Sequence, residues 1–301
     1  MRKLFLATLA FGAFGGAAVA ADMPLKAPVP PPIAVYNWTG FYAGLNAGYG
    51  WGDASSINNP VDPASMIVFS NDNFPTSTFN SSFRQKGAIA GGQAGYNWQF
   101  SNRVVAGIEA DLQFSDIRGR DFHQAFLDPA TFLNNFSFNA ITERHLEWFG
   151  TVRGRLGFLA TPSLLLYGTG GLAFGDTTSR GDVILAPAGP SSIGVSIGGF
   201  LFGCATAPAT PTSTCYTGSN RQTSVGWSAG LGGEWMFAKN WSAKLEWLHL
   251  DLPGSTVTLV SPSPPSTAGV STVYTFNHQT YDIVRAGINY HFAAGPVVAK
   301  Y

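Results

Sequence analysis

Polar and apolar residues alternate along this chain, and the last long segment shows the pattern most clearly. Every second position from Val284 to Phe292 is apolar, namely Val284, Ala286, Ile288, Tyr290 and Phe292, with Arg285, Asn289 and His291 between them. Successive residues of a β-strand point to opposite sides of a sheet, so the segment predicts a strand with one apolar and one polar face. Its aromatic residues come last, where a lipid-facing strand would meet the membrane interface.

Seven earlier segments resemble this one in length and pattern. The eight predicted strands lie near 39–51, 88–100, 103–114, 145–158, 164–174, 224–237, 241–251 and 282–292. In the fourth, the pattern assigns Leu146, Trp148 and Val152 to the apolar face and Glu147 to the polar one. The fifth is apolar on both faces, and its orientation is not predicted.

The connections between these segments also alternate, in length. Those at 101–102, 159–163 and 238–240 are short, whereas 52–87, 115–145, 175–223 and 252–280 are long. A soluble β-sandwich also has alternating strands, but aromatic residues clustered at strand ends are typical of a membrane girdle. We therefore predict an all-β fold, an eight-stranded antiparallel transmembrane β-barrel with four long extracellular loops and short periplasmic turns.

The first residues predict export. Arg2 and Lys3 precede an uncharged run that ends in small residues, the pattern of a signal peptide over 1–20. Five prolines within 24–35 favour an extended linker at 21–36, with a peptidoglycan-binding tether as the alternative. The barrel then covers 37–292 and a tail covers 293–301. Without Arg2 and Lys3 the chain has 15 basic and 17 acidic residues, a net charge of −2, and no basic stripe suggests nucleic acid.

Two cysteines, Cys204 and Cys215, lie in a segment rich in Thr, Pro and Ala. Export to an oxidising compartment favours a disulfide between them. A metal site is not expected, because no histidine or further cysteine lies nearby in the sequence.

Four blocks of sequence resemble a known family. They are Tyr36 to Gly52, Thr151 to Gly157, Tyr167 to Ala173 and Val284 to Phe292. They are similar to small outer-membrane proteins of rhizobial-type alphaproteobacteria, the opacity-like eight-stranded barrels to which porin activity is often assigned. The resemblance implies an abundant outer-membrane protein with a role in envelope integrity. Many such barrels end at the terminal Phe, whereas here residues 293–301 follow the strand that the barrel-assembly machinery would recognise.

Charged residues recur on the predicted inner face. Glu109 and Arg153 are expected at similar height on neighbouring strands, flanked by Asp111 and Arg155. On later strands Glu246 should pair with Arg285, and Lys244 can face Glu234. Such a barrel is just wide enough for side chains to fill it, so these charges must be paired. They predict either a salt-bridged core or a gate that opens a narrow water path.

The sequence offers little for catalysis. His123, His145, His249 and His278 are scattered without a nucleophile or ligand spacing, so we expect no enzyme activity and no cofactor or metal. The long loops carry many phenylalanines (Phe69, Phe74, Phe79, Phe83, Phe122, Phe126, Phe132, Phe136 and Phe138). These residues either fold over each other, continue the strands above the membrane or form a contact surface for ligands.

Together these patterns predict a structural protein of the bacterial outer membrane with at most a narrow pore. A small-solute porin and a surface adhesin or receptor are the alternatives. The expected partners are outer-membrane lipid, lipopolysaccharide, the barrel-assembly machinery and surface ligands at the loops.

Overall fold

The computed structural model describes residues 36–60, 80–126, 136–187, 195–197, 200–202, 213–260 and 271–292. These residues belong to one compact unit. The predicted signal peptide, nearly all of the linker and the tail lie outside the described residues and stay predictions. So do Cys204 and the side chain of Cys215, and with them the disulfide.

Every regular element of the described chain is a β-strand. Their bounds are β1 Gly40–Pro60, β2 Ser81–Gln99, β3 Val104–Phe126, β4 Phe136–Thr161, β5 Leu164–Pro187, β6 Val195–Ile197, β7 Phe200–Phe202, β8 Ser213–Ala238, β9 Trp241–Leu252, β10 Ser255–Val260, β11 Ser271–Phe276 and β12 Gln279–His291. No helix in these parts is long and apolar enough to cross a membrane.

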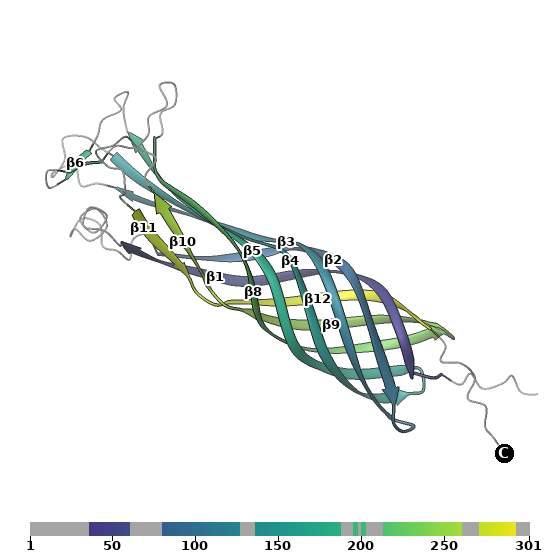
Figure 1. Cartoon of the computed structure of the whole chain (residues 1–301). Coiled ribbons are helices and arrows are strands. Elements are labelled where there is room, and N and C mark those ends of the chain that lie inside the picture. The colour runs from purple at the N-terminus through teal and green to yellow at the C-terminus, as the bar shows by residue number, and fades with distance from the viewer. Residues whose placement is uncertain are drawn as a thin grey trace, which may run out of the picture. The chain divides into compact units, whose positions relative to one another are not determined.

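The strands close into a ring. The antiparallel order β2, β3, β4, β5, β8, β9, β12, β1 returns to β2, because β1 pairs with β2 from Gly40 opposite Asn97 to Ser56 opposite Ser81. β10 and β11 continue β9 and β12 toward one end of the barrel (Figure 1). Eight strand positions therefore surround one interior and leave no edge unpaired. The predicted eight-stranded antiparallel barrel is confirmed.

The two ends of the barrel differ. At one end, called here the turn end, β2–β3, β4–β5 and β8–β9 are joined by short turns, as predicted. The chain enters and leaves at this end, where the amide of Phe292 donates to the carbonyl of Phe41 at 2.8 Å. The opposite end is called the loop end.

The strands extend much further toward the loop end than the sequence pattern indicates. β4 begins at Phe136 rather than near residue 145, and β8 begins at Ser213 rather than near 224. Part of the predicted loop sequence is therefore strand: Phe83 points into the barrel and Phe122 lies exposed on its outer wall. Phe69, Phe74, Phe79 and Phe132 lie outside the described residues, and the loop-receptor hypothesis stays a prediction.

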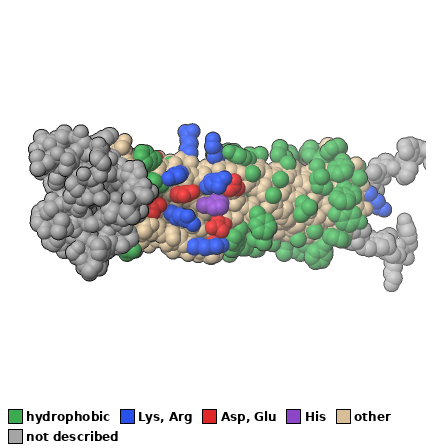
Figure 2. Space-filling model, turned by 90° about the horizontal axis from the view of Figure 1, so that it is seen from above, with side chains coloured by type: hydrophobic (Ala, Val, Ile, Leu, Met, Phe, Trp, Pro, Cys, Tyr) green, Lys and Arg blue, Asp and Glu red, His purple; other side chains and the backbone are tan. Residues whose placement is uncertain are grey.

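An apolar belt surrounds the wall near the turn end. Phe158 and Trp148 mark its two borders on β4, ten residues apart, and hydrophobic side chains fill the belt between such borders (Figure 2). Ten residues span about 33 Å of strand, or about 25 Å along the barrel axis at a tilt of about 40°. That height matches the hydrocarbon thickness of a bacterial outer membrane.

The outward face agrees with the predicted alternation, with one exception on β4. Val284, Ile288 and Phe292 of the last strand are exposed, as expected. Leu146, predicted to face lipid, is instead fully buried inside the barrel. A bulge between Leu146 and Trp148 shifts the pairing of β4 with β5 by one residue and so inverts the pattern beyond it.

The structure also orients β5, which is apolar on both faces. Leu166 and Leu172 point outward, whereas Leu165, Tyr167 and Ala173 are buried inside. The inward residues pack in apolar clusters at either end of a polar layer, and this explains why alternation is invisible in the sequence of β5.

Candidate functional site

A network of charged side chains fills the barrel at the height of the apolar belt. The eight residues named from the sequence all lie in it: Glu109 and Asp111 on β3, Arg153 and Arg155 on β4, Glu234 on β8, Lys244 and Glu246 on β9, and Arg285 on β12. All eight are buried, and four carboxylates face four cations.

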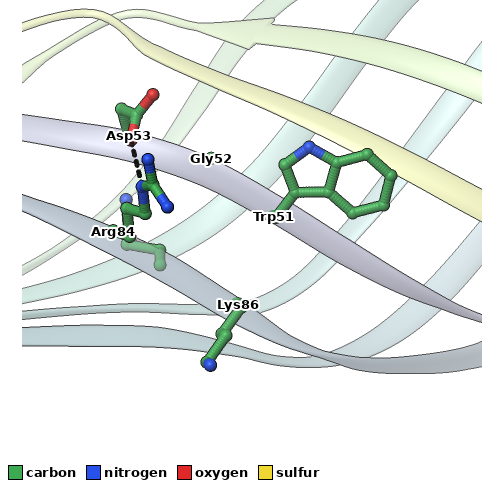
Figure 3. A pocket seen from close by; sticks show the side chains of 6 residues that line it. Trp51, Gly52, Asp53, Arg84 and Lys86 are labelled. Atoms are coloured by element: carbon green, nitrogen blue, oxygen red, sulfur yellow. Dashed lines mark ion pairs between the residues drawn. The ribbon is translucent and has the colours of Figure 1, made fainter.

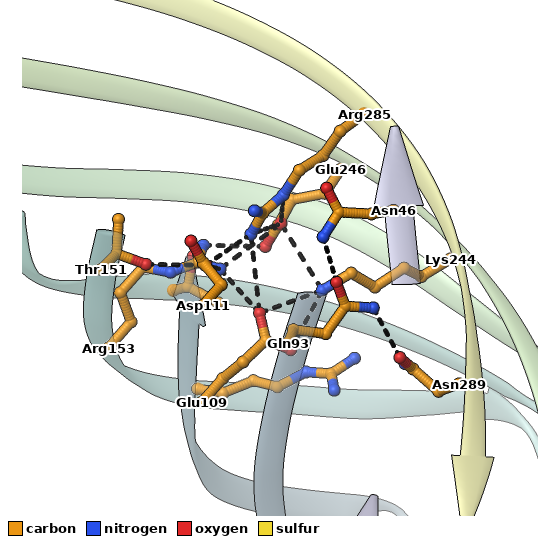
Figure 4. A network of polar contacts seen from close by, with 12 residues as sticks. Asn46, Gln93, Glu109, Asp111, Thr151, Arg153, Lys244, Glu246, Arg285 and Asn289 are labelled. Atoms are coloured by element: carbon orange, nitrogen blue, oxygen red, sulfur yellow. Dashed lines mark hydrogen bonds and ion pairs between the residues drawn. The ribbon is translucent and has the colours of Figure 1, made fainter. Parts of the chain in front are cut away.

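Arg153 occupies the centre of the network (Figure 4). Its Nη2 donates to Glu109 Oε1 at 2.7 Å and to Asp111 Oδ2 at 3.0 Å. Its Nη1 donates to Glu246 Oε1 at 2.9 Å and to the Thr169 hydroxyl at 2.8 Å. One guanidinium thus bridges three carboxylates from two strands.

Arg285 and Lys244 complete the charge balance around the same carboxylates. Arg285 approaches Glu246 Oε2 at 2.6 Å and Asp111 Oδ2 at 2.9 Å. Lys244 Nζ lies 3.0 Å from both carboxylate oxygens of Glu109. Each of the three acids therefore keeps a second cation besides Arg153.

A second group of contacts lies closer to the turn end. Arg155 pairs with Glu234 and stacks over the Tyr167 ring at 3.6 Å. Glu234 also accepts from Ser242 at 2.5 Å and from Asn289 at 2.8 Å. These neutral donors satisfy the lone pairs that a single arginine leaves open.

The expected pairs form in two cases, Glu109 with Arg153 and Glu246 with Arg285. Lys244 lies opposite Glu234 across β8 and β9, but its ammonium turns to Glu109 and Glu246 instead. Asp111 and Arg155, expected to flank one pair, contact Arg285 and Glu234.

Sequence reasoning missed the neutral part of the network. Tyr42 donates to Glu109 at 2.8 Å, Thr151 donates to Asp111 at 2.7 Å, and Gln93 donates to Asn289 at 2.6 Å. All of these side chains point inward in their strands, so the period of two that selects the charges also selects them.

Apolar layers lie on both sides of the network. Toward the turn end the layer consists of Trp38, Val105, Leu159, Leu165, Tyr167 and Met236. Toward the loop end it consists of Ile89, Ile117, Leu146, Phe149, Ala173, Leu248, Leu250, Leu252, Tyr281 and Ile283. Water and ions would have to pass both layers to reach the charges between them.

The described part of the chain holds no group of three or more potential metal ligands among its His, Cys, Asp and Glu residues. Two histidines pair with aspartates beyond the loop-end border of the belt. His249 lies 3.0 Å from Asp282, and His278 lies 3.2 Å from Asp251.

The closed ring, the apolar belt and the polar interior define a transmembrane β-barrel. The chain belongs to the family of outer membrane protein β-barrel domains, whose model matches residues 6–292. It is 32% identical over 295 residues to the 31 kDa outer-membrane immunogenic protein of Brucella melitensis, covering 97% of this chain and all of that one. It is also 29% identical over 157 residues to the 22 kDa outer membrane protein of Rhizobium leguminosarum bv. viciae, covering 52% of each chain. Among solved structures, OprG from Pseudomonas aeruginosa matches 85% of this chain and 99% of its own, with a TM-score of 0.43 and 13% identity.

The protein therefore resides in the bacterial outer membrane, as the sequence predicts. The turn end faces the periplasm and the loop end faces the exterior in proteins of this architecture.

Proposed function

We propose that this protein is a structural barrel that reinforces the outer membrane and keeps its interior closed. One observation supports the proposal: the charge-balanced network lies between two apolar layers. A conducting path would have to wet both layers and separate the pairs, and each charge left buried alone costs several kcal/mol. A filled interior is also what eight strands provide geometrically.

The test is ion conductance of the refolded protein in a planar bilayer, with folding confirmed by a heat-modifiable gel shift. Wild type and the lipid-facing control Val152→Ala are expected to be folded and silent. Discrete, reproducible channels from the folded wild type would overturn the proposal in favour of a small-solute porin.

Arg153→Ala separates a permanent core from a gate. Removing the central guanidinium breaks contacts to three carboxylates and leaves both apolar layers in place. A structural core stays silent in this variant. A gate would conduct ions once the contacts of Arg153 are removed. If the folded variant formed channels and the wild type did not, the gate hypothesis would replace that of a permanently closed core.

A further inference from the structure

The outer wall carries an uneven ring of charge just beyond the loop-end border of the apolar belt. Figure 2 shows charged side chains gathered in this band. On β1 to β3 the outward charged side chains are four basic and two acidic: Arg84, Lys86, Arg118, Arg120, Asp53 and Asp116. We call this set the basic collar. Within this set, positive charges exceed negative ones by two, and Glu143 of β4 lies directly opposite Arg120 at its edge.

The wall beside it, formed by β12 next to β1 and then by β9, differs in sign. The outward charged or titratable residues of β9 and β12 are His249, Asp251 and Asp282, because Lys244 and Arg285 point inward. The basic collar is thus a property of one side of the barrel and not of the whole rim.

Two cations of the basic collar lie side by side. Lys86 is directly opposite Arg118 in the β2–β3 register, and both side chains point outward. Like charges at directly opposite positions destabilise a sheet. Arg118 has a partner in Asp116 at 3.4 Å, whereas Lys86 has no ion pair among the described residues.

A cavity of about 450 Å³ opens beside these cations, lined by Trp51, Gly52, Asp53, Arg84, Gln85 and Lys86. Arg84 reaches Asp53 only at 4.0 Å with both side chains almost fully exposed, and Lys86 points away from that pair (Figure 3). Such an exposed pair contributes little and leaves the guanidinium free to bind another anion.

The position of the cavity along the barrel axis indicates which molecule it can bind. Trp51 belongs to the aromatic border of the belt and is directly opposite Lys86 in the β1–β2 register. Aromatic residues of a barrel stand at the level of the lipid headgroups. The cations therefore lie at the level of the lipid phosphates of the outer leaflet, and the apolar belt next to them lies at the level of the acyl chains of the same lipids.

We propose that the basic collar binds a phosphate of a glucosamine glycolipid, the lipid A part of lipopolysaccharide, between Lys86, Arg118 and the cavity at Trp51. Ammonium and guanidinium groups are the side chains that phosphate prefers. The site is independent of whether the interior conducts, so silence or conductance in the bilayer leaves this inference untouched.

The experiment compares affinities for three probes by titration of the folded full-length protein in detergent micelles, read by native mass spectrometry in EDTA. The probes are lipid A with two phosphates, the same lipid without phosphate, and inorganic phosphate. EDTA prevents divalent cations from bridging phosphate to Asp53. The variant is Lys86→Gln with Arg118→Gln, and the gel shift confirms that it folds.

Arg221→Gln is the matched control. Arg221 is an exposed cation of the same band on β8, across the barrel from β2, and already pairs with Asp176 and with Glu147 at 3.3 Å. Each cation at a lipid surface contributes about fivefold in affinity, so the double variant should bind diphosphorylated lipid A roughly 30-fold more weakly. The control should bind it like wild type.

Equal affinity of wild type and double variant would overturn the proposal, and so would equal affinity for the lipid without phosphate. Binding of inorganic phosphate as tight as binding of lipid A would assign the site to a free anion and also refute a lipid site. An equal loss in Arg221→Gln would show a general charge effect and no site on β2 and β3.

Discussion

Neutralising two opposite charges inside the barrel should cost little more free energy of unfolding than neutralising only one of them. The pair to test is Arg153 and Glu109, whose Nη2 and Oε1 atoms lie 2.7 Å apart with both side chains buried. The changes are Arg153→Met and Glu109→Gln, singly and together. Both keep the approximate volume of the side chain and remove its charge.

The magnitude follows from what remains around each group. Breaking a buried ion pair by removing one partner costs about 3–5 kcal/mol. Without Arg153, Glu109 keeps Lys244 at 3.0 Å and Asp111 keeps Arg285 at 2.9 Å. The lower limit therefore applies, about 3 kcal/mol for either single change. The double variant is neutral again, and we expect about 3–4 kcal/mol instead of the additive 6, a coupling of about 2–3 kcal/mol.

The assay is equilibrium urea unfolding of the barrel in lipid vesicles, with the folded fraction read from the gel shift. Val152→Ala, the lipid-facing neighbour of Arg153, controls for changes in β4 that leave the network intact. The reasoning would be refuted if each single change cost less than about 1 kcal/mol and the double variant cost the sum of the two. That result would mean that water reaches the charges, and the closed interior would be wrong as well.

Two further predictions concern the ends of the barrel. Arg144 is buried beyond the loop-end border, over the Phe276 ring at 5.0 Å, with no carboxylate within 4 Å among the described residues, and burial lowers its pKa to about 10. Arg144→Met should therefore stabilise the barrel by roughly 1 kcal/mol or more in the urea assay, and a loss of stability would contradict this. At the turn end, Phe292→Ala removes the last lipid-facing aromatic and should lower the amount assembled in the outer membrane of cells several-fold. The free energy of unfolding of the refolded barrel should change by less than about 1 kcal/mol. If the refolded variant lost stability in proportion to the loss of assembled protein, Phe292 would act through stability alone.

The sequence predicts this fold well inside the membrane and poorly beyond it. Lipid on one side and a polar interior on the other enforce the apolar and polar alternation, so strands such as β12 are visible as patterns. Past the belt the outward residues meet water and many are polar, as Asp53 and Arg84 are on β1 and β2. The backbone pairing continues there, since Ser56 still lies opposite Ser81, but the pattern that reveals it ends.

Within the site, alternation indicates which residues point inward but not which partner each one chooses. Lys244 illustrates the limit, because its register partner is Glu234 and its ammonium binds Glu109 from a strand across the interior. Glycine explains part of the choice. A Cβ at Gly95 would lie 2.5 Å from the Tyr42 hydroxyl, so the missing side chain leaves space for the phenol that donates to Glu109. Such three-dimensional packing leaves no period in a sequence.

The charged network inside the barrel is balanced and the basic collar outside is not, and the supply of counter-charge from the surroundings explains both. In the network inside the apolar belt, four carboxylates meet four cations, because little solvent is available there to compensate an excess of either sign. Outside, the basic collar keeps an excess of two positive charges on one wall, with Lys86 and Arg118 directly opposite each other. An exposed excess is stable where the surroundings supply the missing anions, and at the height of Trp51 the surroundings are lipid headgroups. The balance within the network and the imbalance on the wall thus support the proposed lipid A contact at the membrane border of the outer surface.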